Sequence, residues 1–238
     1  MPQTDIKLIK HNSADGLPAS PTRPSDANMR YVLYSENSSP FSAPVRIAIF
    51  AKDLDIEICP PPGGLKSVAY HAINPLGTIP CLVRGDGFIL PESAAIVEYI
   101  NERFPQPPLL PAEPDLRARA RLLQRIGELG IMTSTVELMQ IARAPSRDEH
   151  FTGIWLTRLV RALASLQAFL GAGHFAVGEA LTLADCQLAP ALFGVPPITA
   201  AFGTGDLIAA YPTVARYYQS CLGHPAIGRV VEEMRQAR

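Results

Sequence analysis

The sequence predicts a protein in two parts, an α/β domain followed by an all-helical domain. The stretch 74–93 contains two short apolar runs separated by Arg84-Gly85-Asp86-Gly87, which is typical of a β-hairpin, and its second run leads directly into apolar residues at helical spacing. Prolines then interrupt the chain within 104–114. Beyond this break, apolar residues recur only at helical spacing, and we find no further strand pattern.

The predicted organisation begins with an extension at 1–29. This stretch is polar and is interrupted by several prolines, a composition that does not bury enough apolar surface to pack. We expect it to lie outside the fold, with an ordered segment draped over the body as the alternative. The α/β domain then covers 30–104, the linker 105–114 and the helical domain 115–238.

Two features of the hairpin point to a binding site. If the Ile79-Pro80 bond is cis, the main chain of Ile79 turns its N–H and C=O outward, where an extended peptide can pair with them as an added strand. Glu92 and Ser93 lie at the start of the next helix, where free amides and the positive end of the helix dipole favour a carboxylate. Together the two features predict a site for a small acidic peptide.

In this stretch, and in the order of its elements, the sequence resembles the glutathione transferases over 30–235. Residues 31–34 fit their first strand, 39–50 their first helix and 56–58 their second strand, which must end by Cys59 because prolines and glycines follow. The resemblance implies a thioredoxin-like N-terminal domain, a helical-bundle C-terminal domain and a homodimer.

The pattern is nearest to two classes of that family. Ser39-Pro40-Phe41 lies over the Cys-Pro-Phe motif of the omega class, with serine in place of cysteine. Val45-Arg46-Ile47-Ala48 matches the zeta class, in which a serine-rich turn comes before the same helix. The zeta run Ser-Ser-Cys-Ser itself is not reproduced here.

The resemblance implies glutathione as the co-substrate, held by the main chain at Ile79 and Pro80 and by Glu92 and Ser93. Lys66 matches the omega-class lysine that reaches the glycyl carboxylate of glutathione, although a solvated loop lysine is the alternative. His71 is a second candidate for that carboxylate.

Ser39 is the predicted catalytic residue. A thiol of pKa about 8.5 is mostly protonated at pH 7, and a hydroxyl at a helix start can stabilise its thiolate by donating a hydrogen bond. Ser38 and Asn37 are adjacent alternatives, and the structural alternative for Ser39 is a simple helix cap. We expect Arg46 to be a structural partner of an acidic residue.

The predicted function is a glutathione transferase that activates the glutathione thiolate for attack on a small hydrophobic electrophile. Because Ser39 replaces the omega-class cysteine, chemistry through a protein mixed disulfide is not expected. The enzyme alternatives are a maleylacetoacetate or maleylpyruvate isomerase and a glutathione-dependent dehalogenase or etherase. The alternative from another class is a transferase-like binding protein without catalysis.

Composition limits the partners. A net charge of −1 provides no basic field for nucleic acid, and no apolar run approaches the roughly 18 residues of a membrane span. No signal peptide is visible, and the four cysteines are far apart, as expected for reduced thiols in a cytoplasmic protein. The histidines have no metal-ligand spacing, so we expect no metal site, and no G-x-S-x-G elbow indicates a hydrolase.

In the helical half, Thr182 and Asp185 have the spacing of a capping box, and loss of Asp185 should cost about 1 kcal/mol or more. Two apolar stripes predict core-facing helices. They consist of Leu116, Ala120, Leu123 and Gly127, and of Leu159, Leu163, Leu166 and Leu170. Four other apolar residues could line the second substrate site, but core packing is the preferred interpretation for each: Met132, Met139, Phe151 and Trp155.

Overall fold

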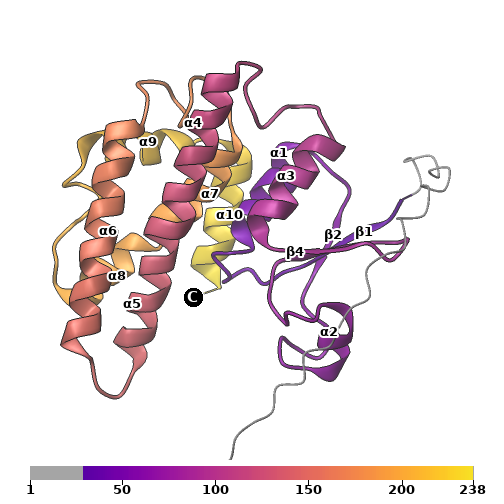
Figure 1. Ribbon diagram of the computed structural model, residues 1–238, viewed down its shortest axis with the longest axis horizontal. Coiled ribbons are helices and arrows are strands. Elements are labelled where there is room, and N and C mark those ends of the chain that lie inside the picture. The colour runs from indigo at the N-terminus through magenta and orange to yellow at the C-terminus, as the bar shows by residue number, and fades with distance from the viewer. Residues whose placement is uncertain (1–28, 238) are drawn as a thin grey trace, which may run out of the picture.

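The computed structural model describes residues 29–237, so most of the extension expected at 1–29 lies outside the described residues. The chain forms an α/β half and a helical half that lie side by side (Figure 1). The α/β half consists of β1 (Tyr31–Tyr34), α1 (Ala43–Ala51), β2 (Glu57–Cys59), α2 (Val68–Ile73), β3 (Cys81–Arg84), β4 (Ile89–Pro91) and α3 (Ser93–Arg103). The thioredoxin-like arrangement predicted from the sequence is therefore confirmed.

The four strands form one mixed sheet in the order β2-β1-β3-β4. β1 is parallel to β2 and antiparallel to β3, and β3 is antiparallel to β4. In this register Tyr34 pairs with both Cys59 and Cys81, and Cys81 pairs with Pro91. The ends of β1, β2 and β4 and the start of β3 therefore lie along one edge of the sheet.

The two faces of the sheet are covered differently. Tyr31 and Leu33 alternate with less buried neighbours along β1 and pack into the core. Helices α1 and α3 lie over this face, whereas the short helix α2 lies on the opposite side of the sheet (Figure 1). α1 is almost entirely buried because it also packs against α7 and α10 of the helical half.

The helical half is built around α7, in which every residue is buried. The predicted capping box of Thr182 and Asp185 is present at its start. The helices of this half are α4 (Pro114–Arg125), the π-helix η2 (Ile126–Met132), α5 (Thr133–Arg143), α6 (Glu149–Phe169), α7 (Leu183–Phe193), α8 (Val195–Phe202), α9 (Pro212–Leu222) and α10 (Pro225–Gln236).

The π-helix η2 joins α4 to α5 and is packed very closely between two neighbours. A Cβ atom on Gly127 would come within 2.9 Å of Leu188 Cδ2 on α7, and one on Gly130 within 2.6 Å of Ala162 Cβ on α6. A side chain at Gly130 would force η2 and α6 apart, because Ala162 Cβ cannot move without its backbone, whereas one at Gly127 would require the Leu188 side chain to shift.

Lys52 fixes the start of the connection between the two halves. It caps the end of α1, is only 5% exposed and donates from Nζ to the carbonyl oxygens of Phe104, at 2.7 Å, and Pro107. Burial lowers the pKa of this ammonium group. Both acceptors belong to the segment between α3 and α4, so the connection between the halves is fixed to the end of α1.

Three details of the sequence-based expectations are wrong. Regular helix begins at Ala43 rather than at 39, because Pro44 has no N–H to donate to the carbonyl of Pro40. Leu116 is 47% exposed in the first turn of α4, where burial begins only at Ala120. Phe151 is 54% exposed in the first turn of α6 and does not belong to the core.

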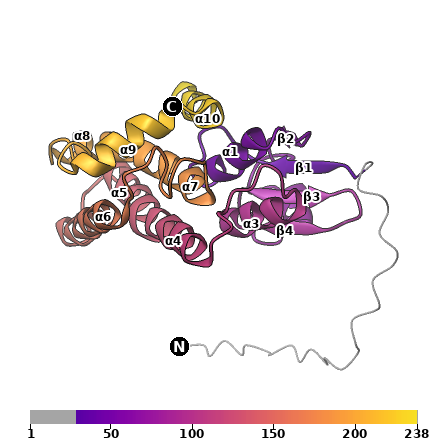
Figure 2. The ribbon, with the colours of Figure 1, turned by 90° about the horizontal axis from the view of Figure 1, so that it is seen from above.

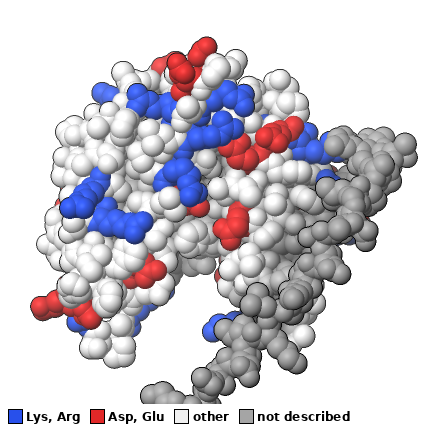
Figure 3. Space-filling view, viewed as in Figure 1, with Lys and Arg blue, Asp and Glu red and all other residues white. Residues whose placement is uncertain are grey.

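The four cysteines are unpaired, and all but Cys59 are buried. Within residues 29–237, no helix is long and apolar enough to cross a membrane. The same part of the chain contains no group of His, Cys, Asp and Glu side chains able to hold a metal ion. Charges of both signs are interspersed on the face in Figure 3, and the outline there is hollowed between the two halves.

Candidate functional site

Every predicted site segment leaves the sheet at the same edge. The Ser39 turn follows β1, the loop with Lys66 follows β2, Ile79-Pro80 comes just before β3, and Ser93 follows β4. The strand order places the segments along this edge in the spatial order Lys66, Ser39, Ile79 and Ser93. The segments of Ser39 and Ser93, which are 54 positions apart in the chain, therefore lie at one edge of the sheet.

The Ser39 turn has the hydrogen bonds of a helix start. Ser39 Oγ accepts from the backbone N–H of Ser42 at 3.2 Å, and the Ser39 carbonyl oxygen accepts from the N–H of Ala43 at 3.2 Å. Ser39 therefore caps the irregular first turn although the regular helix starts four residues later. Because Oγ acts as an acceptor in this bond, its own proton is left for another partner.

Arg46 lies behind this turn, and its side chain is 1% exposed. Its Nη1 atom donates to Glu233 Oε2 on α10 at 2.6 Å. Burial lowers the pKa of the guanidinium, and the charge of Glu233 opposes that effect. The prediction that Arg46 pairs with an acidic residue is confirmed. Sequence reasoning missed Glu233 itself, because nothing local marks a partner 187 positions away.

The Ile79-Pro80 bond is cis, and the loop before it is fixed by buried side chains. The carbonyl oxygen of Thr78 accepts from Tyr70 Oη at 2.6 Å and from Asn74 Nδ2 at 2.8 Å. Burial raises the pKa of Tyr70 to about 12, so its hydroxyl is a donor at neutral pH. Among the described residues, no backbone hydrogen bond uses the N–H or C=O of Ile79, so both groups are available to a ligand.

Asn74 and Tyr70 are supporting residues that the sequence reasoning did not identify. Asn74 is fully buried, and its Oδ1 atom accepts from the N–H of Leu76 at 3.1 Å. An Asn-Pro pair before a glycine is a recognisable turn signal that could have suggested this role. No sequence pattern marks Tyr70 in this way, because its hydrogen bond to Thr78 depends on the position of α2 relative to the loop before β3.

Ser93 is the first residue of α3 and is 5% exposed. The first helical hydrogen bond runs from the N–H of Ile96 to the carbonyl of Glu92 at 2.9 Å, so the amides of the three residues before Ile96 have no partner within the helix. Glu92 is exposed and has a φ of +73°, a left-handed conformation that turns the chain from β4 into α3. This helix start can accept an anion.

The two candidates on the β2 side differ. Lys66 is exposed and has no hydrogen bond or ion pair among the described residues, so its ammonium group is free to reach a ligand. The His71 ring lies against the turn at Gly77, where a Cβ would come within 2.3 Å of His71 Cε1. His71 is nevertheless exposed, so a ligand-binding role for either residue stays a prediction.

The edge of the sheet also carries two cysteines, neither of which is activated. Cys81, next to Pro80, is fully buried, and burial raises the pKa of its thiol to about 11. Burial and the charge of Glu57 also raise the pKa of the half-buried Cys59. Both thiols are therefore protonated at neutral pH, and neither is activated as a nucleophile.

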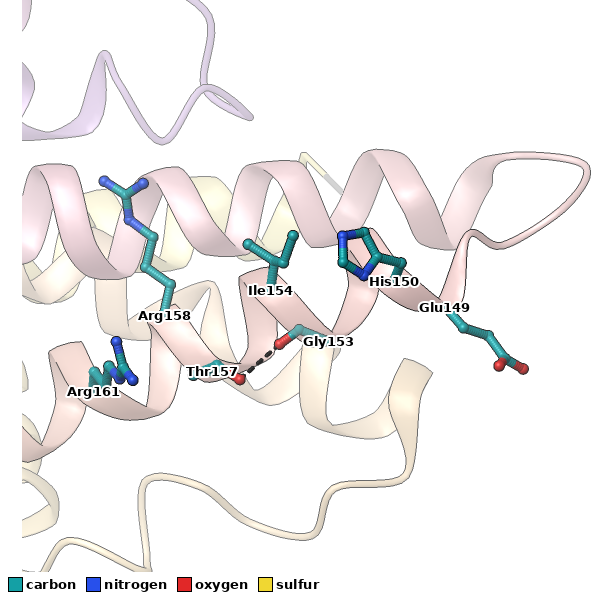
Figure 4. Close-up of a pocket in the computed structure, with 7 residues that line it drawn as sticks. All are labelled: Glu149, His150, Gly153, Ile154, Thr157, Arg158 and Arg161. Atoms are coloured by element: carbon teal, nitrogen blue, oxygen red, sulfur yellow. Dashed lines mark hydrogen bonds between the residues drawn. The ribbon is translucent and has the colours of Figure 1, made fainter.

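A shallow groove of about 700 Å³ lies elsewhere, on the outward face of α6 (Figure 4). α6 is on the far side of the helical half from the sheet in both ribbon views. None of the predicted site residues lines this groove. Its lining consists of Glu149, His150, Gly153, Ile154, Thr157, Arg158 and Arg161.

Comparison with known families gives two matches. Residues 33–108 match the model of the glutathione S-transferase N-terminal domain, and residues 114–220 match that of the glutathione S-transferase C-terminal domain. Together the two ranges cover more than half of the chain. They also meet at the linker between α3 and α4.

The relatives include maleylacetoacetate isomerases, glutathione S-transferases and stringent starvation protein A homologs. Maleylacetoacetate isomerase of Pseudomonas aeruginosa is 32% identical over 201 residues, which are 82% of this chain and 92% of the relative. A stringent starvation protein A homolog of Coxiella burnetii is 33% identical over 166 residues, 69% of this chain and 75% of the relative. The crystal structure of maleylacetoacetate isomerase from Anaeromyxobacter dehalogenans, with GSH bound in its active site, superposes with a TM-score of 0.67 at 30% identity, covering 85% of this chain and 94% of that one.

Proposed function

Because the chain belongs to the glutathione S-transferase family, we propose that it is a glutathione-dependent isomerase acting on a maleyl-type keto acid. The observation that carries the proposal is the 32% identity to a maleylacetoacetate isomerase across 82% of this chain. The expectation from the sequence, a glutathione-using enzyme, is retained, and the isomerase alternative replaces conjugation as the first candidate.

The order of the site segments fits glutathione laid along the sheet edge. Neighbouring strands are about 4.8 Å apart, so the β1 and β4 ends are separated by about 10 Å, close to the length of three extended residues. The γ-glutamyl carboxylate would lie at Glu92 and Ser93, and the cysteinyl main chain at Ile79 and Pro80. The thiol then reaches Ser39, and the glycyl carboxylate points toward Lys66.

Ser39 would hold the glutathione sulfur as a thiolate. Lowering a thiol pKa by two units requires about 2.7 kcal/mol in favour of the charged form. One hydrogen bond to a charged group supplies about 1.5–3 kcal/mol, and a helix N-terminus adds about 0.3–2 kcal/mol. The Ser39 hydroxyl and the turn that it caps are therefore sufficient, and no general base is needed.

The reaction follows from a thiolate next to a conjugated double bond. The sulfur adds to one carbon of the cis double bond, and the π electrons move onto the adjacent carbonyl oxygen as an enolate. The former double bond is now single and rotates. The enolate then re-forms the carbonyl and expels the thiolate, which leaves the trans isomer. Glutathione is regenerated, so it acts as a catalyst.

The test follows glutathione and product together. Purified protein is mixed with glutathione and maleylpyruvate, and the trans product and free thiol are both quantified. We expect many product molecules per enzyme with no loss of thiol. Retention on glutathione-agarose and elution by free glutathione should accompany turnover. A protein that neither binds glutathione nor turns over would instead match the non-catalytic alternative.

Conjugation to a small hydrophobic electrophile is the second candidate, and one observation favours it. The ring of Phe41, two residues after Ser39, is 36% exposed, whereas the residues from Ser42 to Ile49 are fully buried or nearly so. An exposed aromatic ring beside the sulfur position suits an apolar acceptor. An aryl halide would then consume one thiol per product, which separates this activity from isomerisation.

We further propose that the protein is a homodimer joined through α4, η2 and α6. These elements hold most of the exposed large apolar side chains of the described residues, namely Leu116, Leu122, Leu129, Phe151, Ile154, Val160 and Phe169. Light scattering should give twice the chain mass. Ile154→Arg should give one chain mass, and an unchanged dimer would place the interface elsewhere.

A further inference from the structure

The turn that presents Ser39 is held from behind by one buried side chain. Arg46 donates from Nη1 to Asn37 Oδ1 at 2.7 Å and from Nη2 to the Asn37 carbonyl oxygen at 3.0 Å. Ser39 N–H closes the same turn by donating to the Glu36 carbonyl at 3.1 Å. The two prongs of one guanidinium thus fix both the side chain and the main chain of Asn37.

These contacts also set the orientation of the Asn37 amide. A guanidinium has donors only, so the atom of Asn37 that faces Arg46 must be the oxygen. Nδ2 therefore points away from Arg46, and no hydrogen bond within the described part of the chain uses it. Asn37 is exposed, so this NH₂ group can donate to a ligand beside Ser39.

The same arginine is tied to the end of the chain. Glu233 accepts from Arg46 through Oε2 and from Arg229 Nε through Oε1 at 2.9 Å. The Arg229 guanidinium in turn lies 3.7 Å from the centre of the Phe50 ring on α1. α10 is therefore clamped to both ends of α1, and Glu233 fixes the position of the guanidinium that holds the turn.

On the basis of the proposed use of glutathione, we propose that Arg46, anchored by Glu233, is a positioning residue: it holds the Asn37–Ser39 turn so that the Ser39 hydroxyl and the Asn37 amide both face the glutathione sulfur. The C-terminal helix α10 then contributes to the site without touching the ligand. Arg46 itself touches neither glutathione nor substrate, because its side chain is buried.

Positioning and plain electrostatics give different expectations for Arg46→Lys. Lysine keeps the positive charge but is a point donor that cannot reproduce a two-pronged contact. If only the charge mattered, the pKa of the bound glutathione thiol would stay the same. If the turn must be held, that pKa rises because the hydroxyl and the amide lose their alignment with the sulfur.

Arg229→Lys is the matched control, since it makes the same change at the other arginine that binds Glu233, on a side chain that is 60% exposed. The thiolate absorbance of bound glutathione is titrated with pH for wild type and both variants, together with kcat, KM and melting temperature. For Arg46→Lys we expect the pKa of the bound thiol to rise by about one unit, within the range set by one hydrogen bond to a charged group. kcat should fall with it, while KM for glutathione changes only a few-fold. Arg229→Lys should behave as wild type in the titration.

Asn37→Ala removes both the side-chain acceptor that Arg46 holds and the amide donor that faces the sulfur, and it serves if Arg46→Lys does not fold. Its bound thiol should titrate higher in the same direction. If Arg46→Lys, or Asn37→Ala in its place, changes only the melting temperature and leaves the thiol pKa and kcat at wild-type values, the positioning role is overturned. A wild-type protein that binds no glutathione would instead overturn the proposed function.

Discussion

Replacing Asp185 with alanine should destabilise the protein far more than loss of a helix cap. The fully buried carboxylate accepts hydrogen bonds from Ala176 N at 2.8 Å, Thr182 N at 2.7 Å, Thr182 Oγ1 at 2.7 Å and Tyr217 Oη at 2.9 Å. Asp185→Ala leaves two backbone amides and the tyrosine hydroxyl buried without an acceptor, at about 1–3 kcal/mol each. Burying the carboxylate is itself unfavourable and raises its pKa. Removing the carboxylate therefore offsets part of the destabilisation. Three donors left without an acceptor would together cost about 3–9 kcal/mol, and this offset brings the expected loss to about 3–5 kcal/mol.

Asp148→Ala is the matched control. Asp148 caps α6 by accepting from the N–H of Phe151 at 3.0 Å, but it is exposed, so its removal should cost only about 1 kcal/mol. For a chain of this size 1 kcal/mol corresponds to about 2–4 °C, so thermal unfolding followed by far-UV circular dichroism should show a fall of roughly 6–20 °C for Asp185→Ala. If the two variants melt within about 2 °C of each other, the reasoning from four converging donors is refuted.

Three further predictions concern the site and the start of α10. Ser39→Ala should remove the thiolate absorbance of bound glutathione at pH 7 while affinity stays within a few-fold, and a fully active variant would transfer the role to Ser38 or Asn37. Ser93→Ala should weaken glutathione binding about 10- to 150-fold by calorimetry, the loss of one hydrogen bond to a charged group, and an effect on turnover alone would contradict a carboxylate contact. Burial lowers the pKa of His224, against the opposing charge of Asp185, while its Nδ1 atom accepts from Ala226 N at 3.3 Å. His224 therefore takes up a proton more readily in the unfolded chain than in the folded one, so the free energy of unfolding decreases as the pH falls below about 6.5. The melting temperature should fall more between pH 7 and pH 5 for wild type than for His224→Asn, and equal changes would contradict this origin.

The features that the sequence predicted are those set by neighbouring residues. The hairpin within 74–93, the helix from Ser93 and the capping box at Thr182 depend on turn residues, periodicity and caps that are only a few positions apart. The late start of α1 was also available in principle, since Pro44 stands four residues after Pro40 and removes the first regular hydrogen bond.

The features that escaped prediction depend on distant parts of the chain. Glu233 meets Arg46, and Lys52 meets the carbonyls of Phe104 and Pro107, only after both halves have folded. Likewise, periodicity places Leu116 on an apolar face but does not show where the covering helices end. The common edge that gathers the site follows from the strand register, which no single segment encodes.

The attachment of Lys52 to the connecting segment has a consequence for how ligands enter. The buried Lys52 ammonium group donates to two carbonyls at the start of the connecting segment. We expect these hydrogen bonds to restrict hinge motion between the halves. We therefore expect the opening between the halves to keep its width, and molecules to be selected by size and shape rather than by a closing movement. A wider opening would then require substitutions of the side chains that line it.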